Sequence, residues 1–461
     1  MKKFWVALIA VAVVAGFALS ASAADVKFSG SYYATGLYAD NWGLKDDESA
    51  GGVYAQRLRV ATAFKIAEGL TLNTRFDALE GRWGQYGYMG TAVDRQGQVA
   101  GADQRDADDN NISFDRAWVS FAVPFGQFDV GRQAQNEWGT RFASDSFDAE
   151  AIRFSTKNGP WEVGAFFEKQ IEAYGAGDYA NVVSDGGVND GDRDNYGVYG
   201  KYKWDGGIAG LQIQFMNDAT ENFANLNGNG DYKAKVWTFS PYMQGTFGPV
   251  FVEAEINYAY GEAESELNWD DMDIRAWNAF LHAKGNIGPA YVGAFYAYVS
   301  GDDPDSDEEI EGSNFFGASG YRSGLPTGGS IFDPCLILWG AYANKWLGDS
   351  TARALSLGTD HHTGAVMENA HLFQIYGGFK PIPKLDVQAK LSYAFADEKP
   401  DNYDDDEYGT EFDLTAAYKI YDNLTYTVGF GYLWAGDIYK GVTNNDVDDT
   451  YLLMHRLDLS F

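Results

Sequence analysis

Long segments in which apolar and polar residues alternate constrain this chain more than any other feature of its sequence. In the segment LTYTVGFGYLW (424–434), every second residue is apolar or aromatic, and mostly threonine or glycine lies between. Segments 385–395, 412–420 and 250–260 repeat the pattern, with aspartate, glutamate, lysine, asparagine and other polar residues at most alternate positions. A period of two belongs to an extended strand with one apolar and one polar face. The sequence therefore predicts an all-β fold.

The alternation continues to the end of the printed sequence, in the segment YLLMHRLDLSF (451–461). One face carries Tyr451, Leu453, Leu457, Leu459 and Phe461, with His455 as its one polar residue. Terminal residues usually fray unless other parts of the structure hold them. We therefore expect this last strand to pair with the first one, VKFSGSYYATGLY (26–38), and to close a barrel.

The beginning of the sequence indicates export. Lys2 and Lys3 precede the apolar stretch FWVALIAVAVVAGFAL, and the small residues of 21–23 form a cleavage site. We expect residues 1–23 to be a cleaved secretory signal peptide, with an uncleaved anchor helix as the alternative, and residues 24–461 to be one β-barrel pore domain. Past the signal, no apolar run is long enough for a membrane helix. Cys335 is the only cysteine, so no disulfide is expected within the chain.

The 461 residues carry a formal net charge of -32, which argues against nucleic-acid binding because that requires a basic surface. Disorder is equally unexpected in a chain with 30 Tyr, 30 Phe and 13 Trp.

The connections between the alternating segments fall into two classes. Short turns with Gly, Pro or Asn occur at 67–69, 124–126, 158–160, 248–249, 288–289, 381–383 and 422–423. Between them lie long acidic connections such as DQRDADDN, SDGGVNDGDRDN, DDPDSDEEIE, EKPDNYDDDE and NNDVDD. Short periplasmic turns that alternate with long outer loops are typical of a transmembrane antiparallel up-and-down β-barrel.

The strand count is about 18, and 16 to 20 strands would fit the sequence. The expected strands are 25–39, 53–65, 70–80, 111–123, 127–133, 150–157, 161–172, 195–204, 210–218, 234–247, 250–262, 274–286, 290–301, 369–380, 384–396, 409–421, 424–437 and 449–461. Pro241 lies inside the tenth strand, where we expect a bulge or a misplaced boundary because a closed barrel has no free edge for proline. The segment 302–368 is a long outer loop or an inserted segment, and 331–346 within it is open to interpretation as a helix, an inward fold or two more strands.

The segment FGQFDVGRQ (125–133), in the fifth expected strand, resembles the general porins, in which that strand carries a G-x-F-D-x-G-R motif. The end on Phe461 resembles the C-terminal signature of Gram-negative outer-membrane proteins, which the barrel assembly machinery recognises. The resemblance implies location in the outer membrane of a Gram-negative bacterium, a homotrimer, and a third outer loop that folds into the lumen and forms a constriction.

The resemblance also implies a constriction with basic residues on the barrel wall and acidic residues on the inward loop. Arg132 ends the matched motif, and Arg57, Arg59 and Arg75 are further basic candidates. The acidic candidates are Glu137, Asp145, Asp148 and Glu150. The loop lacks the P-E-F-G turn of the general porins, so the facing pairs stay open. Opposed charges of this kind would create a transverse electric field across the pore.

An aqueous lumen is expected for a barrel of this size. We therefore expect a porin for passive diffusion of ions and small polar solutes, with either charge preference open. A sugar-selective channel is the nearest alternative and would use lumenal aromatic residues; Trp118, Tyr33, Phe166 and Tyr199 are candidates. The basic residues leave a carboxylate or amino-acid channel open as well.

An outer-membrane β-barrel enzyme is the alternative from another class, and a secreted adhesin is a third. The five histidines are His282, His361, His362, His371 and His455, and we find no pattern of a catalytic constellation around them. We expect no catalytic residues, no bound cofactor and no protein metal site at His361 and His362. Divalent cations are expected only as loose bridges between the acidic outer loops and lipopolysaccharide phosphates.

Overall fold

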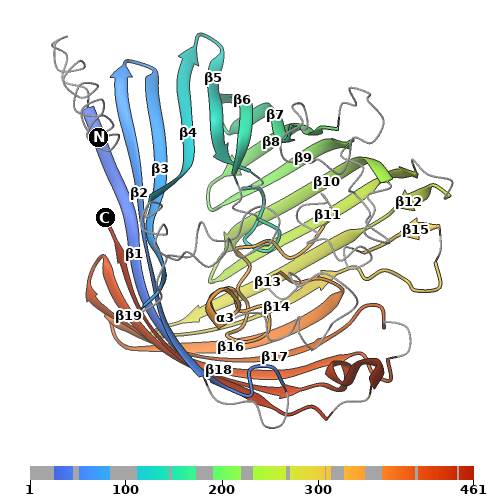
Figure 1. Cartoon of the computed structure of the whole chain (residues 1–461). Coiled ribbons are helices and arrows are strands. Elements are labelled where there is room, and N and C mark those ends of the chain that lie inside the picture. The colour runs from blue at the N-terminus through green and yellow to red at the C-terminus, as the bar shows by residue number, and fades with distance from the viewer. Residues whose placement is uncertain are drawn as a thin grey trace, which may run out of the picture.

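Strands dominate the computed structural model of the chain (Figure 1). It describes residues 25–44, 51–83, 112–135, 137–144, 148–172, 191–219, 232–265, 270–306, 308–312, 326–347, 366–399, 403–443 and 446–461. The expected signal peptide lies outside these residues.

Eighteen long strands follow one another around a closed antiparallel barrel. They are β1 (Asp25–Asp40), β2 (Gly51–Ala67), β3 (Leu70–Arg82), β4 (Ile112–Val123), β5 (Gly126–Ala134), β6 (Asp148–Asn158), β7 (Trp161–Ile171), β8 (Arg193–Trp204), β9 (Gly207–Asp218), β10 (Tyr232–Phe247), β11 (Val250–Ser265), β13 (Trp277–Ile287), β14 (Ala290–Val299), β16 (Ala370–Ile382), β17 (Leu385–Phe395), β18 (Glu407–Tyr421), β19 (Leu424–Ala435) and β20 (Thr450–Ser460). Each corresponds to one of the eighteen strands expected from the sequence, so the expected fold and strand count are confirmed.

The barrel closes where the sequence predicts. Strand β20 pairs with β1 in antiparallel register from Ser31 opposite Ser460 to Asp40 opposite Tyr451. Beyond the ladder, the backbone N–H of Gly30 donates to the carbonyl oxygen of Phe461 at 2.8 Å, and the reverse bond measures 3.1 Å. The last residue is therefore held by the first strand.

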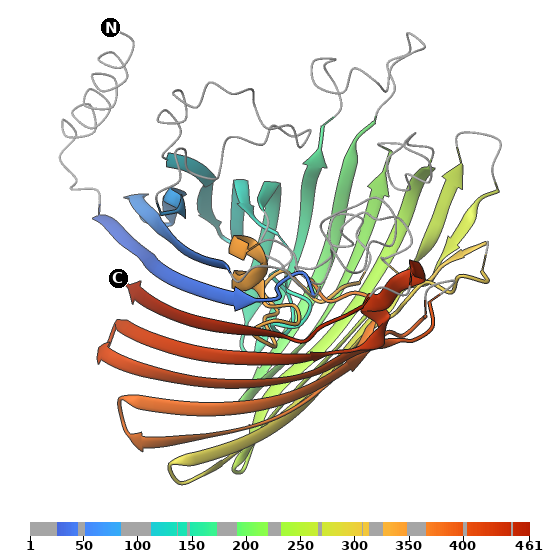
Figure 2. The same cartoon turned by 60° about the horizontal axis from the view of Figure 1, so that its bottom comes forward.

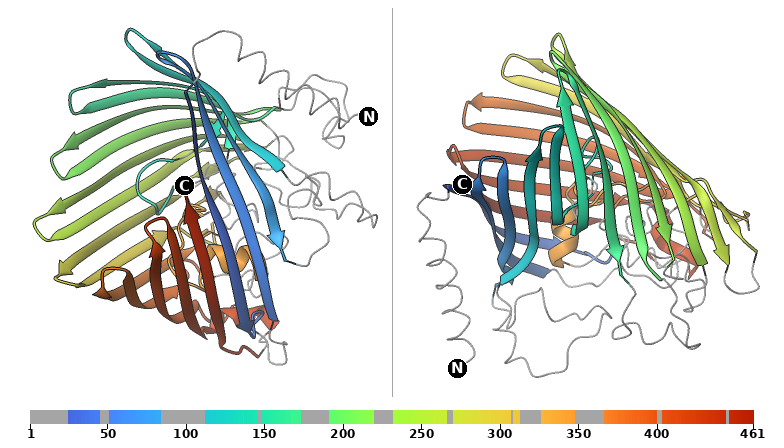
Figure 3. Two further views of the ribbon diagram at one scale, coloured as in Figure 1. Left: turned by 90° about the vertical axis from the view of Figure 1, so that its left-hand side faces the viewer. Right: turned by 90° about the horizontal axis from the view of Figure 1, so that it is seen from above.

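The short turns all lie at one end of the barrel, as expected, and the strand ends that border the long connections lie at the other (Figures 2 and 3). Every short turn has two residues between its strands, as in Gly248–Pro249 and Gly288–Pro289. Both glycines have φ of +61°, a left-handed conformation that glycine adopts without steric cost. The alternation of the sequence thus becomes an outward apolar face and an inward polar face on each strand.

Strand β10 continues straight through Pro241. Its pairing with β9 is uninterrupted, with Pro241 opposite Leu211. The ladder with β11 stops after Phe239 and resumes at Tyr242 opposite Glu255 in the same register. The expectation of a bulge or a misplaced boundary is therefore wrong in both forms, because proline removes one donor on the β11 side without adding a residue to the strand.

The described part of 302–368 is neither an ordinary loop nor two more barrel strands. Residues 326–347 fold into the barrel and end in the helix α3 (Ala341–Leu347), which the strands surround in Figure 1. The short strand β12 (Met272–Ile274) pairs antiparallel with the outer end of β11, and β15 (Glu309–Ile310) pairs with β12 in parallel. A 3₁₀ helix, η4 (Asp437–Thr443), precedes β20. Within the described ranges, no helix is long and apolar enough to cross a membrane.

Candidate functional site

Two segments fold into the lumen and contact each other. We call residues 137–144 the first inward segment and residues 326–347 the second inward segment. The backbone N–H of Gly329 donates to the carbonyl oxygen of Phe142 at 2.6 Å. The Phe142 ring stacks on Phe280 of β13 and meets Phe332 edge-on, each with ring centroids 5.1 Å apart. The two segments therefore form one body inside the barrel.

Polar contacts hold the first inward segment against β10 and β11. The backbone N–H and the hydroxyl of Thr140 both donate to Glu255 Oε2 at 2.6 Å. The indole N–H of Trp138 donates to the carbonyl oxygen of Ser240 at 2.8 Å. Gly139 has φ of +75°, and a Cβ there would lie 2.5 Å from the Glu255 carboxylate, so only glycine fits this position.

A buried glutamate also holds the second inward segment, on the β18 side of the barrel. Glu411 accepts the backbone N–H groups of Leu336, Ile337 and Leu338 at 2.9, 2.8 and 2.7 Å. Asp333 Oδ1 accepts the N–H of Ala341, the first residue of α3, at 2.9 Å. The chain thus turns around one carboxylate before the helix begins.

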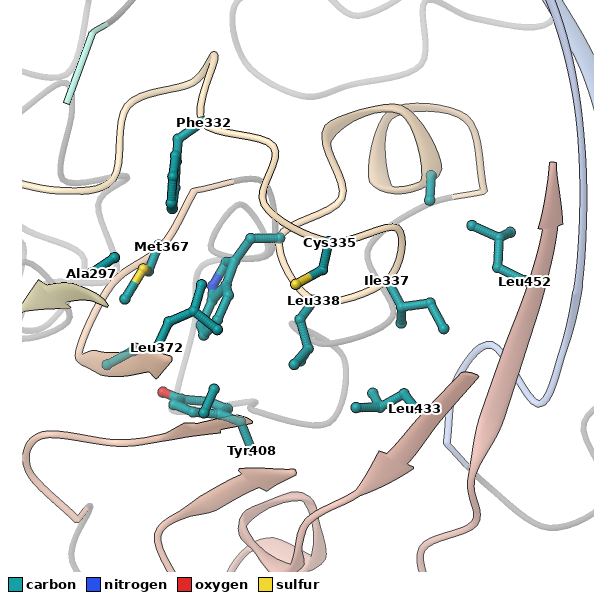
Figure 4. Packing of buried hydrophobic residues seen from close by; sticks show 14 of the residues in the cluster. Ala297, Phe332, Cys335, Ile337, Leu338, Met367, Leu372, Tyr408, Leu433 and Leu452 are labelled. Atoms are coloured by element: carbon teal, nitrogen blue, oxygen red, sulfur yellow. The ribbon is translucent and has the colours of Figure 1, made fainter. Parts of the chain in front are cut away.

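The second inward segment also packs into the larger of the two apolar clusters found among the described residues (Figure 4). Ile337, Leu338 and Trp346 are fully buried in it. They pack with wall residues that include Leu372 of β16 and Leu433 of β19. Burying one such side chain stabilises a fold by about 1.5–3 kcal/mol, so this cluster fixes the segment in place.

Four arginines on neighbouring strands line the opposite wall, and we call them the arginine wall. They are Arg57 and Arg59 of β2, Arg75 of β3 and Arg116 of β4. Arg59 forms two hydrogen bonds of 2.6 Å with Asp77. Arg75 Nε donates to Asp115 at 3.2 Å. The structure thus brings together three of the four predicted arginines, Arg57, Arg59 and Arg75, and adds Arg116.

Of the predicted acidic residues, two face the arginine wall and one lies on the outward face of the barrel. Asp148 accepts hydrogen bonds from Arg75 at 2.9 Å and from Arg116 at 2.5 Å. Glu137, on the first inward segment, lies 3.6 Å from Arg116 Nη1. Both therefore face the arginine wall. Asp145 lies outside the described residues.

Arg132 and Glu150 do not join this group, which corrects the expectation for both. They are directly opposite each other on β5 and β6, and Arg132 Nη1 lies 3.0 Å from Glu150 Oε1. Their positions alternate with the inward Gly131 and Gln133 and share a face with Val130 and Ile152. These last two are 37% and 48% exposed on the outward face. The motif lies in the fifth strand, as expected, but the Arg132 side chain is on the outward face of that strand.

Some acidic residues stand on the same wall as the arginines, so their charges offset part of the expected transverse field. Asp77 and Asp115 supply most of this local pairing, and neither of them, nor Arg116, was predicted from the sequence. Asp77 shares the parity of Arg75, so a search for charges of one parity would have found it. Asp115 turns inward because the β3–β4 register shifts between Arg75 and Phe76, and the sequence gives no sign of that shift.

The second inward segment reaches the arginine wall at its helical end. Lys345 of α3 pairs with Glu80 of β3. The Arg456 guanidinium lies 3.7 Å from the ring centroid of Tyr342 in α3 and 4.4 Å from that of Tyr33 in β1. The Arg57 guanidinium lies 5.3 Å from the same Tyr33 ring.

Hydrogen-bond donors remain unpaired in this corner of the lumen. Among the described residues, Arg57 Nε, Arg456 Nη1 and the Tyr33 hydroxyl are buried and have no hydrogen-bond partner. All three can donate, and the two arginines have no acceptor atoms. These atoms are enclosed by the protein, and both arginines also have acidic neighbours: Arg57 Nη1 lies 3.6 Å from Glu80, and Arg456 Nε donates to Asp458 at 2.7 Å.

The four aromatic residues considered for sugar binding have inward parity but form no continuous track. Tyr199 packs against Trp138 at 5.5 Å, and Tyr33 packs against Tyr342 at 5.7 Å. Phe166 lies under the Arg153 guanidinium at 5.8 Å. Trp118 is on β4, opposite Gly131. The inward segments cover two of the four.

The three described histidines are dispersed. His282 contacts Glu253 at 2.8 Å and the Tyr376 hydroxyl at 2.7 Å on the lumenal side. His371 contacts Tyr296 and Asp397 on the outward side. His455 is on the outward face of β20, as expected, while His361 and His362 lie outside the described residues.

Cys335, Glu411 and Asp413 bring three possible metal-ligand atoms within 4.8 Å of one another. Glu411 already accepts three backbone N–H groups, and the Cys335 thiol donates to the Ser392 hydroxyl at 3.2 Å. The cluster thus serves to anchor the second inward segment.

Comparison with known proteins agrees with the barrel. The model of the Gram-negative porin family matches residues 7–325. Comparison with curated protein sequences gave no match. Among solved structures, the chain is similar to OccAB1 of Acinetobacter baumannii, with a TM-score of 0.55, 13% identity, and coverage of 96% of this chain and 99% of that one. The chain is also similar to OccK8 (OprE) of Pseudomonas aeruginosa, with a TM-score of 0.50, 12% identity, and coverage of 95% of this chain and 98% of that one.

At these identities the structural likeness shows the fold alone, whereas the family match covers well over half of the sequence. The chain belongs to the Gram-negative porins, and it is an outer-membrane channel for the diffusion of solutes.

Proposed function

We propose that the channel conducts ions and small polar solutes passively, and that its neck lies between the arginine wall and the two inward segments. The observation that carries this proposal is the joined body of the inward segments. It is anchored at Glu255 and Glu411 and reaches the opposite wall through Lys345 and Tyr342. Solutes that cross the barrel must pass this body.

We propose further that the neck favours anions, which makes a carboxylate-selective channel the second candidate. The positive charges of Arg57 and Arg456, which lie beside Tyr33 and Tyr342 at the helical end of the second inward segment, support this preference. Acidic outer loops enrich cations at the mouth, but charges at the narrowest point govern selectivity. A sugar-selective channel has less support, because its aromatic residues are separated and partly covered.

The test is single-channel conductance in a planar bilayer, with the reversal potential measured under a potassium chloride gradient. Large ohmic steps are expected, with a reversal potential of the sign for anion preference. The double variant Arg57→Gln/Arg456→Gln should lose that preference. Arg132→Gln removes the same kind of charge from the outward face and should leave the potential unchanged.

The possible results separate the two parts of the proposal. A correctly folded protein that gives no conductance steps would rule out an open passive pore. A wild-type potential of the opposite sign, or a double variant with the wild-type potential, would rule out the anion-selective neck.

We infer that the chain has no enzymatic activity of its own. The contacts of His282 and His371 are with carboxylates and tyrosine hydroxyls, on opposite faces of the wall. Neither arrangement contains a serine or cysteine nucleophile beside the ring. Release of fatty acids or peptides from outer-membrane substrates by purified protein, lost in His282→Ala or His371→Ala, would contradict this inference.

We propose that the channel is a homotrimer inserted by the barrel assembly machinery, and that residues 1–23 are removed during export. Family membership supports the trimer, and the apolar terminal strand ending on Phe461 supports the assembly route. Native mass spectrometry of the purified protein would give both the number of copies and the mass of the mature chain.

We also propose that divalent cations link the acidic outer loops to lipopolysaccharide phosphates, since two negative surfaces need a cation between them. A chelator should then release lipopolysaccharide from the purified protein. Unchanged retention after chelation would contradict the proposal.

A further inference from the structure

A groove of about 670 Å³ crosses the outward face of the barrel over β13, β14, β16 and β17. Its lining is almost wholly apolar. The floor consists of small residues at outward positions of these strands: Ala283, Gly285, Ala294, Gly377 and Ala389. The rim includes the larger Ile375, Leu391 and Phe412. The groove therefore lies on the side of the wall that faces the membrane, not the lumen.

The strand register places the floor residues side by side. Gly285 is opposite Val292, Val292 is opposite Gly377, and Gly377 is opposite Ala389. In the next row towards the outer end, Ala283 is opposite Ala294. Small residues thus lie on all four strands of the groove, with Val292 between Gly285 and Gly377 in the first row.

Nothing inside the protein requires glycine at the two glycine positions of the floor. A Cβ on Gly285 would meet no atom within 4 Å, and a Cβ on Gly377 would have its nearest neighbour, the Tyr291 carbonyl oxygen, at 3.7 Å. Neither glycine has a positive φ. By contrast, a Cβ on the inward-facing Gly293 would lie 2.3 Å from the Tyr376 ring.

Glycine inside a strand costs roughly 0.5–1 kcal/mol relative to alanine, and it often marks a place where a ligand approaches the backbone closely. For Gly293 the packing of the lumen explains the residue. For Gly285 and Gly377 the explanation has to come from outside the barrel.

We propose that this groove binds one hydrocarbon chain of a phospholipid in the periplasmic leaflet of the outer membrane. The groove is continuous with the lipid-facing surface, since the neighbouring Val292 and Ile375 are 53% and 61% exposed on the same face. It lies near the short-turn end of the barrel, because Gly285 is close to the β13–β14 turn at Gly288. This end faces the periplasm. The proposal rests on the membrane location, and it is independent of the selectivity of the neck.

The experiment fills the groove with larger side chains of the protein itself. In Gly285→Leu/Gly377→Leu, two leucine side chains enter open space, so the barrel itself should accept them. Wild type and variant are purified in mild detergent, incubated with phosphatidylethanolamine, and examined by native mass spectrometry. We expect wild type to retain one more phospholipid per chain than the variant. Phosphatidylethanolamine should also protect wild type, but not the variant, against thermal unfolding.

Ala165→Leu is the matched control, because Ala165 is an exposed outward position on β7, away from the groove. This variant should retain as much phospholipid as wild type. Single-channel conductance should be the same in all three proteins, which confirms that each variant is folded. If the wild type gives no conductance steps either, that result contradicts the proposed open pore and leaves the proposal for the groove unaffected.

Two results would overturn the proposal. Equal phospholipid retention by wild type and the groove variant would show that the groove holds no lipid chain. A loss of oligomers in the groove variant, with unchanged lipid retention, would show that a second copy of the chain occupies the groove instead.

Discussion

The two inward segments share an anchoring device but differ in what surrounds it. In each, a buried glutamate on a barrel strand accepts hydrogen bonds from the segment. Glu255 accepts the N–H and the hydroxyl of Thr140, and Glu411 accepts three backbone N–H groups. Around Glu255 the other contacts are mainly polar, as in the bond from Trp138 to Ser240. Around Glu411 lies the large apolar cluster with Trp346.

This difference indicates different roles for the two segments. Apolar burial is non-directional and extensive, so it gives the second inward segment most of its stability. Hydrogen bonds to one carboxylate are directional, so they fix the position of the first inward segment more than its stability. The second segment sets how much of the lumen is filled, and the first sets the shape of the remaining opening.

The largest effect should come from removing the second inward segment. If residues 331–346 are replaced by a short Gly/Ser linker, the lumen loses its apolar cluster and the barrel strands remain. Single-channel conductance should rise several-fold. Replacing residues 138–142 in the same way should raise it much less, because only one fully buried ring, Phe142, leaves the lumen.

An equal rise in both variants would contradict the division of roles. An unchanged conductance after replacement of 331–346 would show that solutes do not pass beside this segment at all. Resistance of the barrel to unfolding in detergent provides the control for correct assembly.

The sequence predicts the first of these segments better than the second, for a physical reason. A period of two identifies strands, and turn composition orders them, so all eighteen strands and the pairing of β20 with β1 could be predicted. An inward segment has no period of its own. The first could be anticipated only from its position after the FGQFDVGRQ motif, and the segment 331–346 could not be told from a helix or further strands.

The site shows the same limit at the level of single residues. Parity alone was enough to place Arg57 and Arg59 on one face. Arg132 was assigned by its motif against its parity, and the structure follows parity. Glu255 and Glu411 were not singled out, because an inward carboxylate on a strand looks the same in sequence whether it meets water or a folded loop.

The next largest effect should come from neutralising the two anchors. Glu411→Gln keeps one acceptor oxygen, which can hold two of the three backbone donors, and turns an N–H₂ group towards the third, so we expect a loss of roughly 2–3 kcal/mol in the free energy of unfolding. Glu255→Gln should cost less, roughly 1–2 kcal/mol, because the Thr140 hydroxyl can turn and accept the new donor. Urea unfolding in lipid vesicles measures both.

The order of the two values is the decisive result. A larger loss for Glu255→Gln would reverse the comparison and make the first inward segment the more firmly held one. Glu150→Gln, an outward change of the same kind, is the matched control and should alter the free energy of unfolding by only a few tenths of a kcal/mol.

A smaller and more local effect is expected from Gly139→Ala. Alanine at a φ of +75° costs about 1–2 kcal/mol, and its Cβ would press on the Glu255 carboxylate. The first inward segment should leave its anchor, with a red shift of the Trp138 fluorescence. Gly51→Ala is the control, since a Cβ there meets no atom within 4 Å and φ is not positive. A folded Gly139→Ala protein with unchanged fluorescence would show that the bond to Glu255 does not determine the position of this segment.

The smallest effect concerns the outer part of the connection that carries the second inward segment. Burial raises the pKa of Asp302 from 3.8 to about 7. The backbone N–H groups of Glu311 and Gly312 oppose this rise, and the carboxylates of Glu311 and Asp303 add to it. The native state therefore holds a proton that the unfolded chain releases between about pH 4 and pH 7. Its contribution to stability is complete below pH 4 and is lost as the pH rises through 7.

This outer stretch should consequently open more readily at pH 8 than at pH 5, while the apolar cluster around Trp346 stays closed. Hydrogen exchange of the Glu311 amide, which donates to Asp302 at 2.8 Å, reports the opening directly. Its protection factor should fall with rising pH in wild type and stay constant in Asp302→Asn, whose side chain carries no charge at any pH. Asp305→Asn, an exposed neighbour, should behave as wild type. If the Asp302→Asn protein keeps the pH dependence of the Glu311 protection factor, a group other than Asp302 controls the opening of this outer stretch.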